Sequence, residues 1–246
     1  AIQVYKTAVK YDPDNIETRM MLAEGLYHNG SVQAAENELQ RILEKSPDCI
    51  PALLLMAEVQ SAWDVWWQQG NAPRYWYRVL ELDPGNEIAR QSLVDHYLHE
   101  AYQFAPLYGE EFAIGYCEKA LEVSPNDAQA LTLLGAYSLR VGRVEAGEAA
   151  LNRVLENAGD NWTARASVCE VRLVEVSEAA FWSTVAQIEA EVGAEAIPYD
   201  FYLTLGDASL QSDVVSISPE LFERAAERAP EDVPIFSMIG EIVILS

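Results

Sequence analysis

The sequence predicts an all-α fold built from repeated helix–turn–helix units. Four short phrases recur along the chain: "YDPDN" at 11–15, "KSPDC" at 45–49, "LDPGN" at 82–86 and "VSPND" at 123–127. Their prolines are spaced by 34, 37 and 41 residues, at Pro13, Pro47, Pro84 and Pro125. A helix breaker followed by Asn or Asp at a period near 34 is typical of a unit made of two helices joined by short turns.

The repeated phrases divide the chain into units. We expect a half unit at 1–13, whole units at about 14–47, 48–84, 85–125, 126–159, 160–193 and 194–230, and a half unit at 231–246. Gly159 and Gly193 stand where the earlier phrases have proline, and Pro230 restores it. Because each half unit lacks its partner helix, we expect the chain to be a segment of a longer array.

Small residues recur at one register. In three units the eighth position is small and follows a leucine: Ala23, Gly135 and Gly206. A small residue there lets the first helix of the unit approach the second closely. No such unit can bury its apolar face alone, so we expect stability to come from the stacking of neighbouring units.

The spacing, the small residues and the endings "ILEKSP", "VLELDP" and "ALEVSP" together resemble the tetratricopeptide repeat family, over essentially the whole chain. The fifth unit, 162–193, matches least, and Arg172 occupies a position where the family usually has an aromatic residue. The resemblance implies a single right-handed superhelical solenoid over 1–246. It also implies a concave inner wall, lined by the first helices, that binds peptides through positions 2, 5, 9, 12 and 13 of each unit.

Charge restricts the choice of partner. Sixteen basic residues face thirty-nine acidic ones, for a formal net charge of −23. A chain this acidic repels phosphate backbones, which argues against nucleic acid and favours a basic protein or peptide, although the charge could also serve solubility alone. No stretch of about 18 apolar residues is present, so we expect no membrane insertion. Without a signal-like start, we expect a cytoplasmic protein.

Residues that could carry chemistry are few. Cys49, Cys117 and Cys169 are far apart, which favours buried thiols over a disulfide framework or a zinc site. His96 and His99 share a helix face, and we interpret them as ordinary surface histidines. There is no phosphate-binding loop, nucleophile elbow or HExxH motif. We therefore expect that this segment is not an enzyme and needs no cofactor or metal.

Acidic residues gather at the ninth position of the units, which the resemblance places on the concave wall. Six of the seven ninth positions are acidic: Glu24, Glu58, Asp95, Glu170, Asp207 and Glu241, with Ala136 as the exception. Carboxylates one repeat apart lie roughly 10 Å from each other. One divalent cation needs several oxygens at about 2.3–2.6 Å, so this spacing does not suit a metal ladder.

Apolar residues dominate the twelfth position, beside the acids. The predicted strip comprises Tyr27, Leu98, Leu139, Leu173 and Leu210. An acidic ladder beside an apolar strip suits an extended or helical segment that carries Lys or Arg and leucine-like anchors. The alternative is that the ninth-position acids are only solvated or contact neighbouring helices. The Lys and Asn residues with which some family members grip a chaperone's terminal carboxylate are absent, because Met20 and Glu24 occupy those positions.

Aromatic residues concentrate where the second and third units exceed the 34-residue period. In "SAWDVWWQQG", 61–70, we expect Trp63, Trp66 and Trp67 at the extended end of a first helix, while Trp76 is an ordinary buried residue of the second helix. In the third unit we expect "HEAYQFAPLYGEEF", 99–112, at the equivalent inter-helix turn, with Tyr102, Phe104 and Tyr108. These aromatics either pack on one another or form a second contact surface for a partner protein.

The sequence therefore predicts a protein–protein interaction module whose concave acidic groove binds a basic, partly apolar peptide or helix. Two alternatives remain open. The segment could be a sensor or regulatory arm of a multidomain effector enzyme, or it could be a structural scaffold subunit of a large assembly. A repeat fold does not by itself distinguish these functions.

Overall fold

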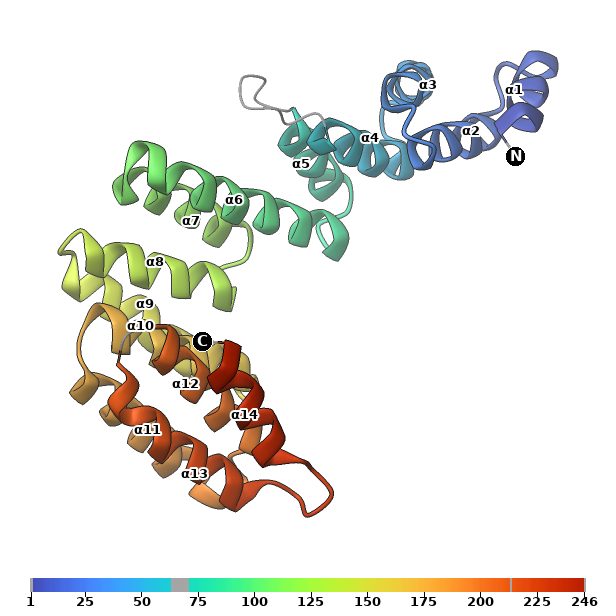
Figure 1. The fold of residues 1–246 in the computed structure, drawn as a ribbon. Helices are drawn as coiled ribbons and strands as arrows, with labels where there is room; N and C mark the ends of the chain where they lie inside the picture. The colour runs from blue at the N-terminus through green and yellow to red at the C-terminus, as the bar shows by residue number, and fades with distance from the viewer. Residues whose placement is uncertain (1, 63–70, 213, 246) are drawn as a thin grey trace. The chain divides into compact units, whose positions relative to one another are not determined.

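The computed structural model describes residues 2–62, 71–212 and 214–245 (Figure 1). Those residues form fourteen α-helices and two short 3-10 helices, and no strand occurs among them. The predicted all-α fold is thus confirmed. The chain divides into two compact units, Ala1–His96 and Tyr97–Ser246, which we describe separately.

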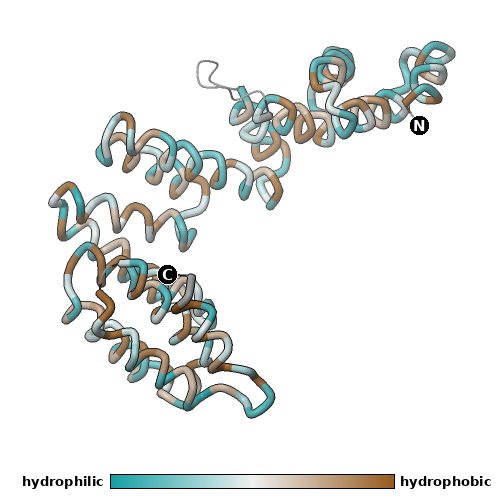
Figure 2. Tube along the Cα trace, viewed as in Figure 1, coloured by the Kyte–Doolittle hydropathy of each residue, from teal (hydrophilic) through white to brown (hydrophobic). Residues whose placement is uncertain are grey.

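The first unit is a run of antiparallel helices. It contains α1 (Ile2–Tyr11), α2 (Ile16–His28), α3 (Val32–Lys45), α4 (Ile50–Ala62), α5 (Ala72–Leu82) and the first part of α6 (Glu87–Tyr108). Each helix from α1 to α4 contacts the next, and α2 also contacts α4. Apolar residues lie along every helix rather than in one layer (Figure 2). The core joins α2, α3 and α4 through residues such as Leu22, Leu39, Ile42 and Met56.

The second unit continues the same pattern. It contains the rest of α6, α7 (Glu110–Val123), α8 (Ala128–Arg140), α9 (Val144–Asn157), α10 (Trp162–Glu175), α11 (Glu178–Val192), α12 (Tyr199–Gln211), α13 (Ser218–Arg228) and α14 (Ile235–Leu245). The 3-10 helices Ala194–Ala196 and Val215–Ile217 lie between α11 and α12 and between α12 and α13. A continuous core runs through α8 to α14 and includes Leu151, Phe181, Phe201 and Leu221.

The Asn or Asp of the repeated phrases begins the following first helix. The side-chain oxygens of Asn15, Asn86 and Asp127 accept hydrogen bonds from the backbone N–H three residues later, at 2.9, 3.1 and 2.8 Å. Asn161 does the same after Gly159, at 3.0 Å. Such N-caps satisfy a backbone donor that the helix itself leaves unpaired. The phrase therefore ends one helix at its Pro or Gly and starts the next at its Asn or Asp.

Small residues allow close helix contacts at the eighth position, as expected. A Cβ added to Gly135 would lie 2.6 Å from Cδ2 of Leu151 on α9, and one added to Gly206 would overlap the ring of Phe222 on α13. Ala23 is fully buried at the same register. The first and second helices of these units thus pack at a separation that a larger side chain would prevent.

Three arginines fix the turns between units. Arg19, Arg90 and Arg165 each donate from the guanidinium to the carbonyl of the turn residue six positions earlier, Pro13, Pro84 or Gly159, at 2.7, 2.6 and 3.0 Å. We call these three residues the turn arginines. These carbonyls lie in the turns between helices and so take no part in helical hydrogen bonding, and the guanidinium supplies them with a charged donor.

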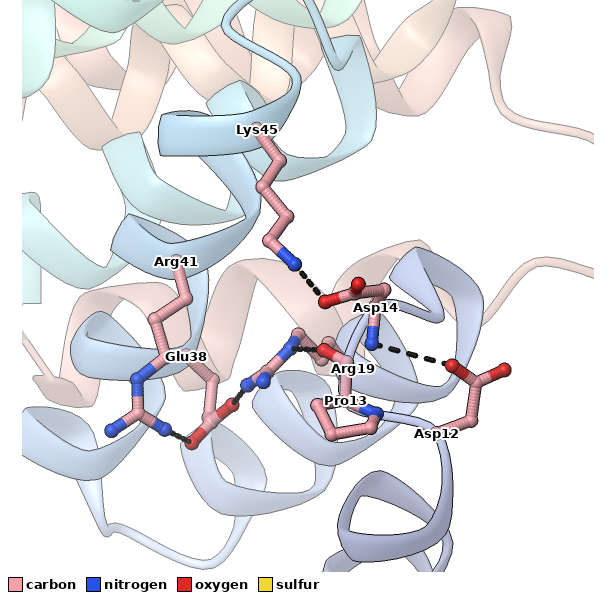
Figure 3. Close-up of polar contacts among 7 residues, drawn as sticks. All are labelled: Asp12, Pro13, Asp14, Arg19, Glu38, Arg41 and Lys45. Atoms are coloured by element: carbon pink, nitrogen blue, oxygen red, sulfur yellow. Dashed lines mark hydrogen bonds and ion pairs between the residues drawn. The ribbon is translucent and has the colours of Figure 1, made fainter.

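Two of the turn arginines also tie a first helix to its second helix. Arg19 pairs with Glu38 on α3, which in turn pairs with Arg41 (Figure 3). Arg165 is buried and pairs with Glu191 on α11 at 2.8 Å. One side chain thereby connects the turn, the first helix and the second helix of a unit.

Arg172, at the position where the family usually has an aromatic residue, is also buried. Its guanidinium donates to Thr184 at 2.7 Å, to Glu148 at 2.7 Å and to Asn152 at 2.8 Å. The fifth unit thus replaces an aromatic contact by a polar network that joins α9, α10 and α11. The weak sequence match of this unit has its physical reason in that network.

We expect Gly206→Ala to lower the free energy of unfolding by about 1–3 kcal/mol, because the new methyl group collides with a buried ring. Gly115→Ala on α7 is the matched control, since no atom lies within 4 Å of a Cβ added there. The control should raise the free energy of unfolding by about 0.5–1 kcal/mol through helix propensity. Urea denaturation measures both. Equal effects of the two substitutions would contradict the close-contact assignment.

We expect Arg165→Met to lower the free energy of unfolding by about 1–3 kcal/mol, because the Gly159 carbonyl loses its donor. Arg153→Met should change it by no more than about 0.5 kcal/mol, although Arg153 also donates to a turn carbonyl, that of Pro125, because this arginine is solvent-exposed.

The effect of Arg165→Met should depend on pH. Arg165 holds the pKa of the Glu191 carboxyl below its usual range. Stability from such a group is present above the unfolded pKa and is lost as the pH falls through the folded pKa. The difference between the wild type and the variant should therefore become smaller in acid, while the part due to the hydrogen bond with the Gly159 carbonyl remains. A difference that is constant from neutral to acidic pH would contradict the role of the ion pair.

Candidate functional site

Within each of the two compact units, the first helices of successive hairpins lie side by side. In the first unit α2 contacts α4, and in the second unit α8 contacts α10, α10 contacts α12 and α12 contacts α14. We call these two sets of helices, each with the part of α6 that belongs to its unit, the first-helix walls. This arrangement follows from the repeat, because α2, α8, α10 and α12 each pack on the first helix of the next hairpin as well as on their own partner helix.

The predicted ninth-position acids all lie on the first-helix walls. Glu24, Glu58 and Asp95 belong to the first unit, on α2, α4 and α6. Glu170, Asp207 and Glu241 belong to the second unit, on α10, α12 and α14. Asp207 is half-buried and the other five residues are exposed, so every one of these carboxylates reaches the surface.

None of these six carboxylates has a cationic partner in the part of the chain that the structure describes. The ion pairs of the described residues use other acids, such as Glu38, Glu148 and Glu191. The partners that the wall acids do have are neutral: Gln91 donates to Asp95 at 2.9 Å and Gln211 donates to Asp207 at 3.0 Å. The arginines thus neutralise acids elsewhere and leave the walls anionic.

Two of the wall acids interact with each other. Burial by the surrounding protein raises the pKa of the Glu170 carboxyl, and the charge of Asp207 on the neighbouring helix raises it further. The side chain of Glu170 still reaches solvent. Two like charges on adjacent helices with no cation between them cost free energy. A cation supplied from outside would remove that cost.

The predicted apolar strip reaches the surface only in part. Tyr27, Leu139 and Leu210 are half-buried. Leu98 and Leu173 retain only 3% and 4% exposure and belong to the packed core. A partner could contact them only after the helices had separated, so Leu98 and Leu173 have no place in the binding surface that we propose below.

The aromatic stretch at 99–112 is not an inter-helix turn, contrary to expectation. Helix α6 runs without interruption to Tyr108, and only Gly109 separates it from α7. The extra residues of this repeat thus lengthen its first helix instead of forming a loop. Pro106 lies within the last turn of this extension.

The rings of the extension pack on those of α7. Phe104 lies 5.5 Å from Tyr108, 5.8 Å from Phe112 and 5.8 Å from Tyr116, measured between ring centroids. We call these four residues the aromatic ladder. Its outer members stay exposed, Tyr108 at 66% and Phe112 at 47%. Tyr102, which is also exposed, is not in ring contact with them in the described structure. Trp63, Trp66 and Trp67 lie outside the described residues.

The remaining candidates for chemistry are structural. Cys117 and Cys169 are buried free thiols, and burial raises the pKa of each to about 12. Such thiols are poor nucleophiles. The ring of His96 lies 5.8 Å from that of the buried Trp76. Within the described ranges, no group of three or more His, Cys, Asp or Glu side chains is placed to hold a metal ion.

The second wall also contains a cavity that no sequence pattern predicts. A cavity of about 420 Å³ opens between α8 and α10, near Tyr102 of α6. Its lining carries no charged residue: Tyr102, Ala128, Gln129, Thr132, Leu133, Asn161, Thr163, Ala164 and Ser167. The periodicity that reveals a core residue does not reveal such a cavity, because it depends on how two helices diverge. No helix among the described residues is long and apolar enough to cross a membrane.

Comparison with known proteins supports the repeat assignment. Residues 1–59 match the family described as tetratricopeptide repeat. No curated protein sequence matches the chain significantly.

Among solved structures, a tetratricopeptide repeat protein from Parabacteroides merdae is 15% identical, with 99% of this chain and 91% of that one covered and a TM-score of 0.46. PilW, a widely conserved type IV pilus biogenesis factor, is 16% identical over 91% and 98% of the two chains, with a TM-score of 0.43. YrrB, a tetratricopeptide repeat protein with an unusual peptide-binding site, is 14% identical over 96% and 98%, with a TM-score of 0.39.

The family match covers the N-terminal hairpins, and the described remainder repeats their design. Antiparallel helix pairs follow one another, Asn or Asp caps the first helix at Asn86, Asp127 and Asn161, and small residues hold the paired helices close. The match to the tetratricopeptide repeat family is thus over residues 1–59, and the other described residues form helix hairpins of the same kind.

Proposed function

We propose that the first-helix walls bind a basic, partly apolar segment of a partner protein. Tetratricopeptide repeats are in general protein–protein interaction modules and not enzymes. The observation that carries the finer proposal is that six carboxylates recur at one register and that none of them has a cationic partner among the described residues.

Two alternatives explain the acids less well. If they served solubility alone, they would have no reason to keep one register, and charges on the second helices would do equally well. If they stabilised the fold, they would pair with arginines as Glu38 and Glu191 do. Glu170 and Asp207 instead repel each other. A charge arrangement that costs stability supports a role in binding.

The partner's chemistry follows from the surface. Lys or Arg side chains would lie against the wall acids, and each exposed pair would contribute about 0.2–1 kcal/mol. Several such pairs along one wall add up and speed association through long-range attraction. The half-buried Tyr27, Leu139 and Leu210 would provide apolar contact for leucine-like residues of the same segment.

The aromatic ladder is a candidate for a second contact surface. Tyr108 and Phe112 expose their rings although apolar groups normally avoid water. At the inner end of the ladder, Nζ of Lys119 lies 4.5 Å from the centroid of the Tyr116 ring. This contact within the chain is a cation–π interaction, and a basic partner could make the same contact with the outer rings.

We expect Glu170→Gln to leave the free energy of unfolding unchanged or to raise it by up to about 0.5 kcal/mol, since the substitution removes a repulsion at the surface. Urea denaturation of the unliganded protein at neutral pH measures this. The pKa of Glu170 is raised in the folded protein, so its charged form lowers the free energy of unfolding at pH values above that pKa. This loss of stability disappears as the pH falls below it. A clear loss of stability would mean that the carboxylate serves the fold.

Binding can be tested with a fluorescent peptide of about 12 residues that contains only Lys and Leu, long enough to cross several helices. We expect a variant with Glu58→Gln, Asp95→Asn, Glu170→Gln and Asp207→Asn to bind this peptide at least about tenfold more weakly than wild type. The peptide's affinity for the wild type should also fall as salt rises from about 50 to 300 mM.

The matched control carries four amides at exposed acids on second helices: Glu44, Glu122, Glu156 and Glu223, each changed to Gln. It has the same net charge as the wall variant and should retain wild-type affinity. Affinity for the wild type should also weaken as the pH falls into the raised pKa range of Glu170, because a proton then competes with the peptide's cations. An equal loss of peptide affinity in the two variants would mean that only the net charge matters, and it would overturn the proposal.

A further inference from the structure

The cavity between α8 and α10 lies at the one place where the ninth-position acids are interrupted. Ala136 on α8 stands where the other first helices carry Asp or Glu. The cavity measures about 420 Å³, and no side chain that lines it is charged. In a chain with a formal charge of −23, a neutral cavity on an otherwise anionic wall is a specific feature. It offers a partner a different chemistry from that of the acids.

The hydrogen bonds of the lining residues show which groups remain free to accept. The Thr132 hydroxyl donates its proton to the Ala128 carbonyl at 2.7 Å, and the Ser167 hydroxyl donates to the Thr163 carbonyl at 3.0 Å. Both hydroxyl protons are thus used within a helix. The oxygen atoms keep lone pairs and act as acceptors toward the cavity.

Two amides supply the complementary donors. The Oδ1 atom of Asn161 accepts the N–H of Ala164 at 3.0 Å, which leaves its amino group as a donor. Gln129 is exposed and offers an oxygen and an amino group. The cavity therefore presents acceptors and donors at once. A carboxamide group, with two N–H donors and a carbonyl acceptor, matches this set.

Other side chains fit less well. A carboxylate would enter a strongly negative region next to Glu170. A lysine ammonium in the cavity would lose water and find no carboxylate among the lining residues, which costs free energy. An aliphatic side chain would leave the donors and acceptors of the lining unpaired. The ring of Tyr102 and the alanines of the lining instead suit the methylene groups of Asn or Gln.

The cavity is in register with the acids. Ser167 precedes Glu170 by three residues on α10, a rise of about 4.5 Å along the helix. Adjacent residues of an extended peptide are about 3.3 Å apart. A residue seated in the cavity would thus place a neighbour, one or two positions away, beside Glu170 and Asp207.

We propose that this cavity binds an Asn or Gln side chain of the partner segment, one or two residues from a Lys or Arg that lies against Glu170 and Asp207. The inference rests on the proposed function, since it refines the segment that the second wall would bind. It adds a rule for the partner's sequence, Asn or Gln within two residues of Lys or Arg, that the acids alone do not provide.

A displayed library of random peptides, about 12 residues long, tests the rule with the whole chain as bait. We expect wild type to enrich Asn or Gln within two residues of Lys or Arg. The variant Thr132→Val with Ser167→Ala removes both acceptor oxygens at nearly constant volume. It should lose the Asn/Gln enrichment by at least about fivefold and keep the Lys/Arg enrichment, which also reports that the variant is folded.

Thr204→Val on α12 is the matched control. Its hydroxyl donates to the Asp200 carbonyl at 2.9 Å, as that of Thr132 donates to Ala128, but Thr204 does not line the cavity. The control should select the same peptides as wild type. Enrichment of leucine at that position, or Asn/Gln enrichment that persists in the double variant, would overturn the inference alone. A wild type that enriches no Lys or Arg would overturn the proposed function with it.

Discussion

A helix hairpin of this chain cannot bury its apolar face alone, and the rest of the structure depends on that constraint. Helices α2, α8, α10 and α12 each pack on the second helix of their own hairpin and on the first helix of the next. Gly135 and Gly206 allow the two helices of a hairpin to approach closely. Because hairpins follow one another along the chain, the first helices of neighbouring hairpins also come into contact. First helices therefore line up as a wall within each unit, and a residue type that recurs at one register becomes a row on that wall.

The distribution of charge follows from how the few cations are used. The chain has only sixteen basic residues. The guanidinium groups of the turn arginines bind carbonyls and acids within their own hairpins. Arg172 does likewise in a buried network with Glu148. The ninth-position acids are left without cations among the described residues, and burial together with the charge of Asp207 raises the pKa of the Glu170 carboxyl. The same interactions that hold the fold together thus leave a surface that favours a basic partner.

The repeat made most of the fold predictable, because helix breakers, capping residues and small residues act locally and recur with register. The buried position of Trp76 and the close contact at Gly206 follow from such rules. The features that the sequence did not predict depend on how a residue packs against other helices. Leu98 and Leu173 have the right register for a surface strip but face the core, and the aromatic residues near Phe104 extend a helix where a turn was expected. The roles of the turn arginines and the neutral cavity are visible only in the three-dimensional structure. The sequence does carry one signal for the arginines, because Arg19, Arg90 and Arg165 each follow their turn residue by six positions.

The central claim is that the wall acids are held at a cost that a basic partner removes. The most direct measurement is an NMR titration of the Glu170 carboxyl carbon, with and without a saturating Lys/Leu peptide. We expect a pKa above the usual range for glutamate in the free protein and a lower pKa in the complex, because a cation of the peptide then lies beside the carboxylate. An ordinary pKa in the free protein, or a raised pKa that the bound peptide leaves unchanged, would contradict it.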